Sequence, residues 1–474
     1  MQVGERKRVI LLGLDFGSTT SSALFASAKV ARSIATGHMQ LDDVQVIYKS
    51  EPVFTPFINQ NIDTEKVAKL IANWLDESGV KVTDIFSGGS MITGLAAQAG
   101  NAAALSKLII NMVGESVIAT ANDPCLESWL AFMGSCAALS RYHADVPIIN
   151  FDIGGGTTNV ALGVNGDVQQ TGCYFIGVRH FQFIAGSYQL TGMSSYGAAL
   201  LDDLSINKAI GETLSEDEVN KIITFYISFL KAIVAGDTDF LSSPITQKQS
   251  QVAFIINQNS RPKITFSGGV GELLYKISAG EVPATTTYFG DFGIDLAIAI
   301  SRSTLLSTDL KTCVPEHKGR ATVVGLTLYS TEISGNTIYL PKPDCLPLRD
   351  LPIIAKLAAD SSDELWNNAF ALAAKRQHGA CIQITARNNT LPQVHALAAQ
   401  IKHGLHTNEY VPSQPVVILV EANIGKALGN YICDWGQSQY NLIVIDEVAL
   451  RNAQFVHIGS MHQGMIPVSF FGLN

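Results

Sequence analysis

Two short segments of the chain share a pattern that suits phosphate binding. In each, an apolar run typical of a β-strand ends at an aspartate, and glycine and small hydroxyl residues follow. Glycine lets backbone N–H groups crowd an anion, hydroxyls add donors, and a strand-end aspartate can hold Mg²⁺ directly or through water. The residues are Asp15, Gly17, Ser18, Thr19 and Thr20 in the first segment, and Asp152, Gly154, Gly155, Gly156 and Thr157 in the second. Because the pattern occurs twice, and a strand-like run follows each loop, we expect a nucleotide whose phosphates are clamped between two related lobes.

A third glycine turn supports a nucleotide ligand. The strand-like run 264–267 leads into Gly268, Gly269 and Gly271, after which a helical pattern begins. A Gly-Gly turn permits close backbone approach to a flat ligand, so we expect these glycines to contact adenine and ribose. The chain contains no Gly-x-x-x-x-Gly-Lys-Ser/Thr sequence, which excludes a P-loop enzyme. A dinucleotide fingerprint is also disfavoured, because a strand and not a helix is expected after Gly156.

Bulk composition excludes several classes of protein. The chain has 474 residues, of which 47% are hydrophobic and 15% charged, and this predicts two or three well-buried domains. The net charge of −9 argues against nucleic acid as the main partner. No apolar segment approaches the ~18 residues that span a bilayer, so we expect a cytoplasmic protein with no membrane partner. The seven cysteines include no Cys-x-x-Cys pair and predict reduced thiols. His403 and His406 are expected at a surface helix end and not in a metal site.

The order of predicted elements repeats within the first 302 residues. Residues 1–145 and 146–302 each show three strands joined by short turns, then helix–strand–helix–strand, with the last strand of the second half near 286–289. The pattern predicts an α/β protein with two related lobes. Residues 303–474 are predicted to form an appended C-terminal α/β domain, in which 320–330 and 337–340 make a hairpin.

These features resemble the actin, heat-shock chaperone and sugar-kinase ATPase superfamily over about 8–302. The resemblance implies duplicated actin-like ATPase (ribonuclease H-like) lobes. The chain is also similar, over nearly its whole length, to the reactivating factors of ethanolamine ammonia-lyase, the A protein of ethanolamine utilisation. The segments with this closer similarity are 12–21, 123–128, 151–159, 266–272, 330–338 and 456–472.

The closer resemblance implies a chaperone-like ATPase that uses ATP and Mg²⁺. Its implied partner is ethanolamine ammonia-lyase, from which it releases damaged cobalamin so that intact adenosylcobalamin can bind. The family also implies a location in or beside a bacterial microcompartment, and the sequence leaves a homo-oligomer open.

The superfamily implies a role for each carboxylate. Asp15 and Asp152 would hold hydrated Mg²⁺ between the lobes, and Glu127 would orient a water toward the γ-phosphate, with Asp123 as its rival. The glycine and hydroxyl residues of the two loops would cradle the phosphates. Glu272 follows the third turn, so the basic residue that some relatives use beside adenine is missing there.

Two other functions remain open from the sequence. A small-molecule kinase of the same fold would need a carboxylate base aimed at a substrate hydroxyl, for which Glu127 could serve. An actin-like scaffold protein would assemble in a nucleotide-dependent way. The appended C-terminal domain disfavours simple longitudinal stacking.

Overall fold

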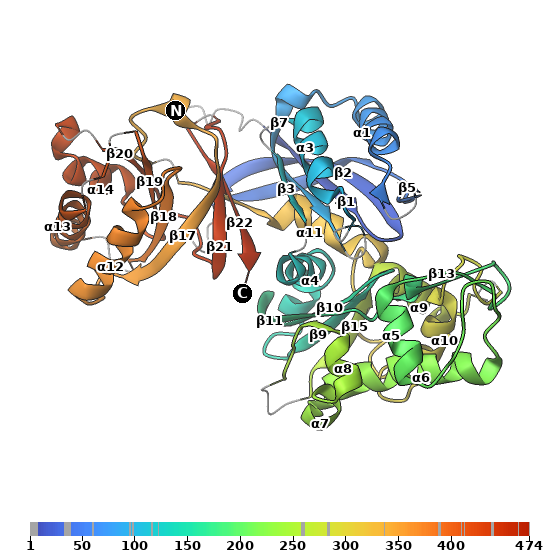
Figure 1. Ribbon diagram of the computed structural model, residues 1–474. Helices are drawn as coiled ribbons and strands as arrows, with labels where there is room; N and C mark the ends of the chain where they lie inside the picture. The colour runs from blue at the N-terminus through green and yellow to red at the C-terminus, as the bar shows by residue number, and fades with distance from the viewer. Residues whose placement is uncertain are drawn as a thin grey trace.

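The computed structural model describes residues 8–32, 39–58, 61–93, 96, 99–114, 117–121, 123–256, 261–281, 285–335, 337–386, 390–408, 410–411, 413–437, 440–462 and 464–473. Three large β-sheets organise this part of the chain, and helices pack on their faces (Figure 1). The mixed α/β architecture confirms the predicted fold class.

The first lobe is built on a six-stranded sheet in which β4 pairs with β2 and the other strands follow the order β3-β2-β1-β7-β8. Strands β1, β2 and β3 are antiparallel neighbours, whereas β7 runs parallel to β1 and β8 parallel to β7. Helices α1 (Thr64–Ser78) and α3 (Ala102–Val113) cover one face and pack on Leu12, Leu14 and Phe16. The strands are β1 (Arg8–Phe16), β2 (Thr20–Arg32), β3 (Met39–Lys49), β4 (Val53–Phe54), β7 (Ile85–Ile92) and β8 (Val117–Ala121), and the pair β5 (Phe57–Ile58) and β6 (Asn61–Ile62) lies beside them.

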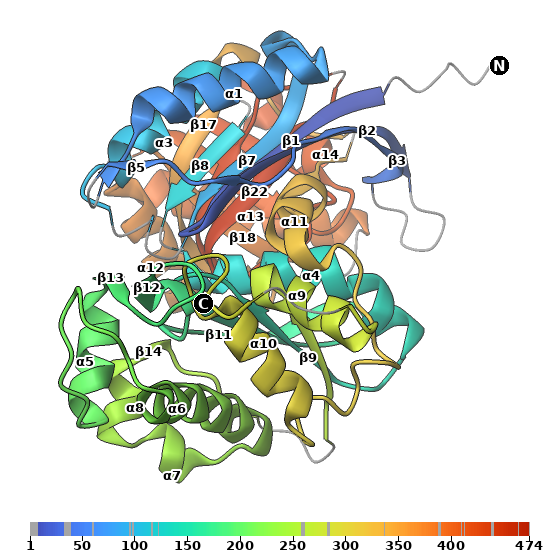
Figure 2. The same ribbon diagram turned by 90° about the vertical axis from the view of Figure 1, so that its right-hand side faces the viewer.

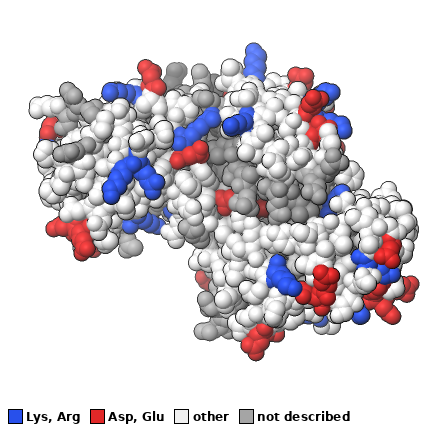
Figure 3. Space-filling view, viewed as in Figure 1, with Lys and Arg blue, Asp and Glu red and all other residues white. Residues whose placement is uncertain are grey.

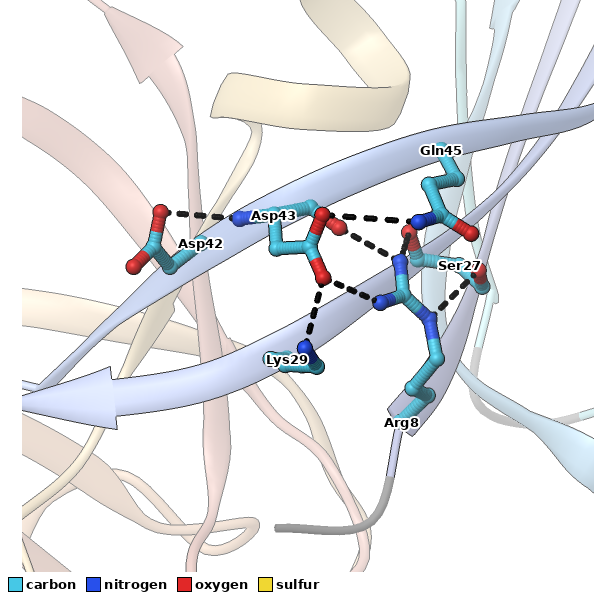
Figure 4. Close-up of polar contacts among 6 residues, drawn as sticks. All are labelled: Arg8, Ser27, Lys29, Asp42, Asp43 and Gln45. Atoms are coloured by element: carbon cyan, nitrogen blue, oxygen red, sulfur yellow. Dashed lines mark hydrogen bonds and ion pairs between the residues drawn. The ribbon is translucent and has the colours of Figure 1, made fainter.

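Polar contacts around Asp43 hold the edge strand β3 to its neighbours (Figure 4). The Asp43 carboxylate lies 2.7 Å from Arg8 Nη1 and 2.8 Å from Lys29 Nζ. These two cations lower the pKa of Asp43 to about 2. Asp43 has a φ of 46°, and the β2–β3 register shifts close to it, between Ser27 and Lys29. The charged contacts therefore stabilise a local irregularity in the sheet.

The second lobe repeats this arrangement in a five-stranded sheet of order β14-β11-β10-β9-β15. Again three consecutive strands are antiparallel, and the first of them pairs in parallel with a later strand. This equivalence confirms the predicted duplication. The strands are β9 (Ile148–Ile153), β10 (Thr158–Val164), β11 (Asp167–Tyr174), β14 (Ser250–Val252) and β15 (Lys263–Ser267), with the small pair β12 (Phe181–Phe183) and β13 (Leu190–Met193). The helices are α5 (Ser195–Asp203), α6 (Glu216–Ala235), α7 (Thr238–Leu241), α8 (Pro244–Lys248), α9 (Gly268–Ser278) and α10 (Gly293–Arg302).

The predicted strand near 286–289 is wrong. Residues 285–290 form a turn, in which Thr287 has a φ of 52° and Gly290 a φ of 73°. The Gly290 N–H donates to Thr287 O at 2.7 Å, which closes the turn. A left-handed backbone at two positions is incompatible with an extended strand.

Two helices lie between the lobes, α4 (Pro124–Tyr142) and α11 (Ala321–Tyr329), as Figures 1 and 2 show. The hairpin expected at 320–330 is therefore wrong, because its first strand is a helix. A Cβ added at Gly134 of α4 would lie 2.0 Å from Ala321 O, and one at Gly325 of α11 would lie 2.0 Å from Leu130 O. These glycines let the two helices cross at backbone contact. The apolar run 321–328 is mostly buried, and such a run has no period that separates strand from helix.

A third, seven-stranded sheet follows in the order β16-β22-β21-β17-β18-β19-β20. Strands β17 to β20 are parallel, and α12, α13 and α14 pack against them around Trp366 and Phe370. The elements are β16 (Thr331–Ile333), β17 (Leu348–Ala358), α12 (Asp363–Ala374), β18 (Ala380–Thr385), α13 (Leu391–Thr407), β19 (Pro415–Val420), α14 (Gly425–Ile432), β20 (Asn441–Ile445), β21 (Ala453–Ile458) and β22 (Pro467–Leu473). The division at residue 302 stays a prediction; α11, which follows it, packs on β1 and β2.

The surface and the remaining side chains agree with the low charge of the sequence. On the face in Figure 3, basic and acidic side chains are interspersed on a largely uncharged surface.

His403 and His406 are exposed on α13. All seven cysteines are free, and six of them are buried. In the part of the chain that the structure describes, no helix has the length and apolar character needed to cross a membrane.

Candidate nucleotide-binding site

The three glycine turns meet around one cavity of about 430 Å³. Each turn stands at the end of a strand: the first joins β1 to β2, the second joins β9 to β10, and the third joins β15 to α9. Parallel pairing of β9 with β15 brings the second and third turns to the same sheet edge. The predicted residues that line the cavity are Asp15, Gly17, Ser18, Thr19, Thr20, Glu127, Asp152, Gly154, Gly155, Gly156, Thr157, Gly268 and Gly269.

The two phosphate-type loops have the same backbone turn. The Gly17 N–H donates to Thr20 O at 2.9 Å, and the Gly154 N–H donates to Thr157 O at 2.9 Å. The loops also face each other closely, because a Cβ added at Gly155 would lie 2.2 Å from Thr19 Oγ1. The duplication seen in the sequence is therefore a duplication of local geometry, with the two copies opposed across the cavity.

Glycines of the third turn have different surroundings. Gly268 has a φ of 77°, and a Cβ there would lie 2.6 Å from Ile153 O, so only glycine fits. A Cβ at Gly269 would meet nothing within 4 Å, which leaves its cavity face open to a ligand. Gly271 does not line the cavity, and a Cβ there would lie 2.8 Å from the carbonyl carbon of Phe266. The structure thus gives Gly271 a packing role between α9 and β15.

Five acidic residues line the cavity: the predicted Asp15, Glu127 and Asp152, and in addition Glu272 and Asp291. Asp152 and Glu127 are buried, and Asp15 is half-buried with a buried Oδ1. Burial, and then the neighbouring Asp152 charge, raise the pKa of Asp15 to about 7. Burial likewise raises the pKa of Asp152 to about 6, against the opposing effect of Ser267 Oγ, which donates to Asp152 Oδ2 at 2.5 Å. The cavity therefore favours protonation of these groups or a compensating cation.

Glu127 lies in the first turn of α4 and extends the acidic group. Burial raises its pKa well above the ordinary value, and the charges of Asp15 and Asp152 add to the effect. Its rival, Asp123, does not line the cavity; its side chain caps α4 by accepting from the Leu126 N–H at 3.0 Å. Of the two acids at this helix start, only Glu127 is placed to face a ligand.

Asp15 Oδ1 and Thr19 Oγ1 have no hydrogen-bond partner within the described residues, although both atoms are buried. Unsatisfied buried oxygens are uncommon in folded proteins and indicate a missing ligand or water. Both atoms belong to the first phosphate-type loop, so the missing hydrogen bonds lie where a phosphate or a hydrated cation is expected.

Several residues that line the cavity were not predicted from the sequence. Lys276 lines the cavity one helical turn after Glu272, and the two side chains form an ion pair at 2.9 Å. The i,i+4 spacing on α9 was a usable signal for this basic residue near the third turn. Arg320 also lines the cavity, and its Nη1 donates to Ser50 O at 2.5 Å. No local signal could place Arg320 there, because it begins a helix that returns from far along the chain.

Two lobes of one topology that close on opposed glycine-hydroxyl loops define an actin-like ATPase fold. Residues 7–473 match the family described as ethanolamine utilisation protein EutA. The chain belongs to that family.

Curated relatives match the chain from end to end. The ethanolamine ammonia-lyase reactivase EutA of Salmonella typhimurium is 27% identical over 473 residues, which is 98% of each chain. The protein of the same description from Escherichia coli is 25% identical over 471 residues, again 98% of each.

Among solved structures, ethanolamine utilization protein EutJ from Carboxydothermus hydrogenoformans is 13% identical and covers 68% of this chain and 89% of its own, with a TM-score of 0.31. Component A of the (R)-2-hydroxyglutaryl-CoA dehydratase of Acidaminococcus fermentans is 15% identical and covers 68% of this chain and 97% of its own, with a TM-score of 0.30.

Proposed function

We propose that this chain is an ATP-dependent reactivating factor for ethanolamine ammonia-lyase. The observation behind the proposal is the cavity itself, in which two turns closed by the same Gly N–H to Thr O hydrogen bond face each other beside the carboxyl groups of Asp15, Asp152 and Glu127. Membership of the EutA family, and the reactivase description of the relatives, supply the partner. The factor releases damaged cobalamin from the lyase so that intact adenosylcobalamin can bind, in the cytoplasm or beside a bacterial microcompartment.

The residues of the cavity fit Mg²⁺ in its hydrated form. Asp15 and Asp152 stand on opposite lobes, and Asp15 Oδ1 is buried without a partner. Within the described ranges, no group of three or more His, Cys, Asp or Glu residues is arranged to hold a metal ion directly. Mg²⁺ usually keeps several of its waters and takes one or two carboxylates plus phosphate oxygens, which agrees with this donor set. The ion would supply positive charge to the phosphates of ATP.

The chain's own groups have distinct tasks in ATP binding and hydrolysis. The N–H groups and hydroxyls of the two loops bind the phosphates, and Gly268 and Gly269 bind the nucleoside with Lys276 nearby. Glu127 orients a water toward the γ-phosphate. Burial is the main cause of its raised pKa, and a cation lowers the pKa by compensating the Asp15 and Asp152 charges that add to the effect of burial. Positioning of this kind accounts for most of the catalysis of phosphoryl transfer.

Reactivation requires that the lobes respond to the nucleotide. Both lobes contribute to the same cavity, so a nucleotide that contacts both of them would change how far they close, and the γ-phosphate is the group by which ATP would differ from ADP. A ligand shifts a conformational equilibrium only by its differential affinity for the two states, and the lyase must therefore also distinguish them.

A recovery assay tests the proposal. Ethanolamine ammonia-lyase is inactivated with cyanocobalamin, then incubated with this protein, free adenosylcobalamin and Mg²⁺, with and without ATP. We expect lyase activity to return only with ATP. The protein with Asp152→Asn serves as the matched control and should restore little activity.

Two companion measurements, ATP turnover and sedimentation, separate the alternative functions. ATP turnover that rises with a small hydroxylated substrate and not with the lyase would indicate a kinase. Nucleotide-dependent pelleting without recovery would indicate a scaffold. Either result would refute the reactivating role.

A further inference from the structure

The third sheet contacts the helix that carries Glu127. Asp123, the N-cap of α4, uses both carboxylate oxygens: Oδ1 accepts from the Leu126 N–H at 3.0 Å, and Oδ2 accepts from the Gly472 N–H at 2.5 Å. Gly472 belongs to β22, near the end of the chain, and Figure 1 shows that end beside α4. One carboxylate therefore joins the start of α4 to the last strand of the third sheet.

Apolar contacts reinforce this link on both sides of Glu127. Leu126 and Leu130 of α4 are buried in one cluster with Met91 and Leu326, and Phe471 and Leu473 of β22 pack against that cluster. The side chains of β22 therefore rest on the first turns of α4, where the orientation of Glu127 is set.

A cation makes a second connection. The Arg451 guanidinium lies 4.4 Å from the ring centre of Trp129 in α4 and pairs with Glu332 of β16. The Arg451 backbone is fixed to β18, because its N–H donates to Gln383 Oε1 at 3.1 Å and its carbonyl accepts from Gln383 Nε2 at 3.0 Å. Arg451 thus connects the interior of the third sheet to a residue two positions beyond Glu127.

We propose that the third sheet controls hydrolysis by positioning Glu127 through Asp123 and Arg451. The inference rests on the proposed function and adds to it a role for the C-terminal part of the chain. A partner that displaces β22 removes the Gly472–Asp123 bond and the packing of Phe471, and the first turn of α4 shifts with Glu127. Asp123 is a positioning residue, since it does not line the cavity.

Asp123→Asn separates this role from helix capping. Asparagine caps helices as well as aspartate does, but it offers one acceptor oxygen in place of two. In the variant the single oxygen keeps the capping bond from the Leu126 N–H, and the amide nitrogen, which is a donor, cannot accept from the Gly472 N–H. Asp63→Asn is the matched control: Asp63 is buried, caps α1 by accepting from the Lys66 N–H at 3.1 Å, and also uses its second oxygen, at 3.2 Å from Lys66 Nζ.

We expect Asp123→Asn to lower kcat for ATP hydrolysis by about 10- to 100-fold, as small displacements of catalytic groups do, with the Kd for Mg-ATP changed less than about twofold. Arg451→Gln should lower kcat by about 2- to 5-fold. Asp63→Asn should lower thermal stability about as much as Asp123→Asn does, but it should leave kcat unchanged. Normal kcat in Asp123→Asn, or equal losses of kcat in both aspartate variants, would overturn the inference.

Hydrogen exchange gives a readout that does not need ATP turnover. The Leu126 and Glu127 amides should exchange faster in Asp123→Asn and in Arg451→Gln than in wild type or Asp63→Asn. Absence of ATPase activity in the wild type would refute the proposed function, whereas unchanged exchange at these amides would refute the positioning role alone.

Discussion

Gly155 is the position where the structure makes the sharpest prediction about lobe closure. Gly155→Ala places a Cβ 2.2 Å from Thr19 Oγ1, whereas real Cβ contacts are essentially never under 3.0 Å. The two loops must separate by about 1 Å, and overpacking of this kind costs about 1–3 kcal/mol. If nucleotide binding requires the closed arrangement, the cost falls on the bound state and weakens Mg-ATP binding by about 5- to 150-fold.

Calorimetric titration of Mg-ATP, together with thermal unfolding in the presence and absence of nucleotide, checks this prediction. The unliganded variant should unfold near the wild-type temperature, because its lobes can open to relieve the contact. Gly192→Ala is the control, since the nearest atoms there belong to the adaptable Gln182 side chain at 3.2 Å. Adding Thr19→Ala removes the clashing hydroxyl and should restore part of the affinity. Wild-type affinity in a folded Gly155→Ala protein would refute the opposed-loop geometry.

Three further predictions concern the carboxyl groups. Asp152→Asn should weaken Mg-ATP binding by about tenfold or more without unfolding the protein, because Ser267 can still bond the amide; unchanged turnover would remove Asp152 from the site. Glu127→Gln should retain Mg-ATP affinity in titrations while hydrolysis falls by about 10²-fold in a phosphate-release assay, and equal loss of both would contradict its role with water. Without Mg²⁺, Asp15 and Asp152 have folded-state pKa values of about 7 and about 6, above the ordinary 3.8, so their contribution to stability is present at pH 4 and is lost as pH rises through 6–7. For Asp15 the loss is on the order of 4 kcal/mol in urea unfolding between pH 4 and 8, and Asp15→Asn should flatten it.

The phosphate-type loops of the cavity were predictable because their signals are local. Each phosphate-type loop is a strand, an aspartate and a glycine-hydroxyl turn within about ten residues, and strand and turn chemistry act at that range. The turn bond from Gly17 to Thr20 recurs from Gly154 to Thr157, as the repeated pattern indicates. The duplicated strand order follows from the same signals, because short turns between strands favour antiparallel neighbours.

Where a segment's environment comes from distant parts of the chain, prediction failed. Residues 321–329 are mostly apolar and show no period that separates strand from helix. The helix is favoured by its close crossing with α4 at Gly134 and Gly325, which the local sequence does not encode. The turn at 285–290 likewise depended on a left-handed Thr287 whose hydroxyl bonds Ser187 O at 2.8 Å.

By itself, the sequence determined the α/β class and the two glycine-hydroxyl loops. Thirteen of the fourteen residues predicted for the site line the cavity, and their contact with a ligand stays a prediction. The packing role of Gly271, the entry of Arg320 into the cavity and the bond from Gly472 to Asp123 were decided only by tertiary structure. The physical reason is sequence separation: Asp123 and Gly472 are 349 residues apart, and no local propensity or periodicity records which distant surfaces a folded chain brings together.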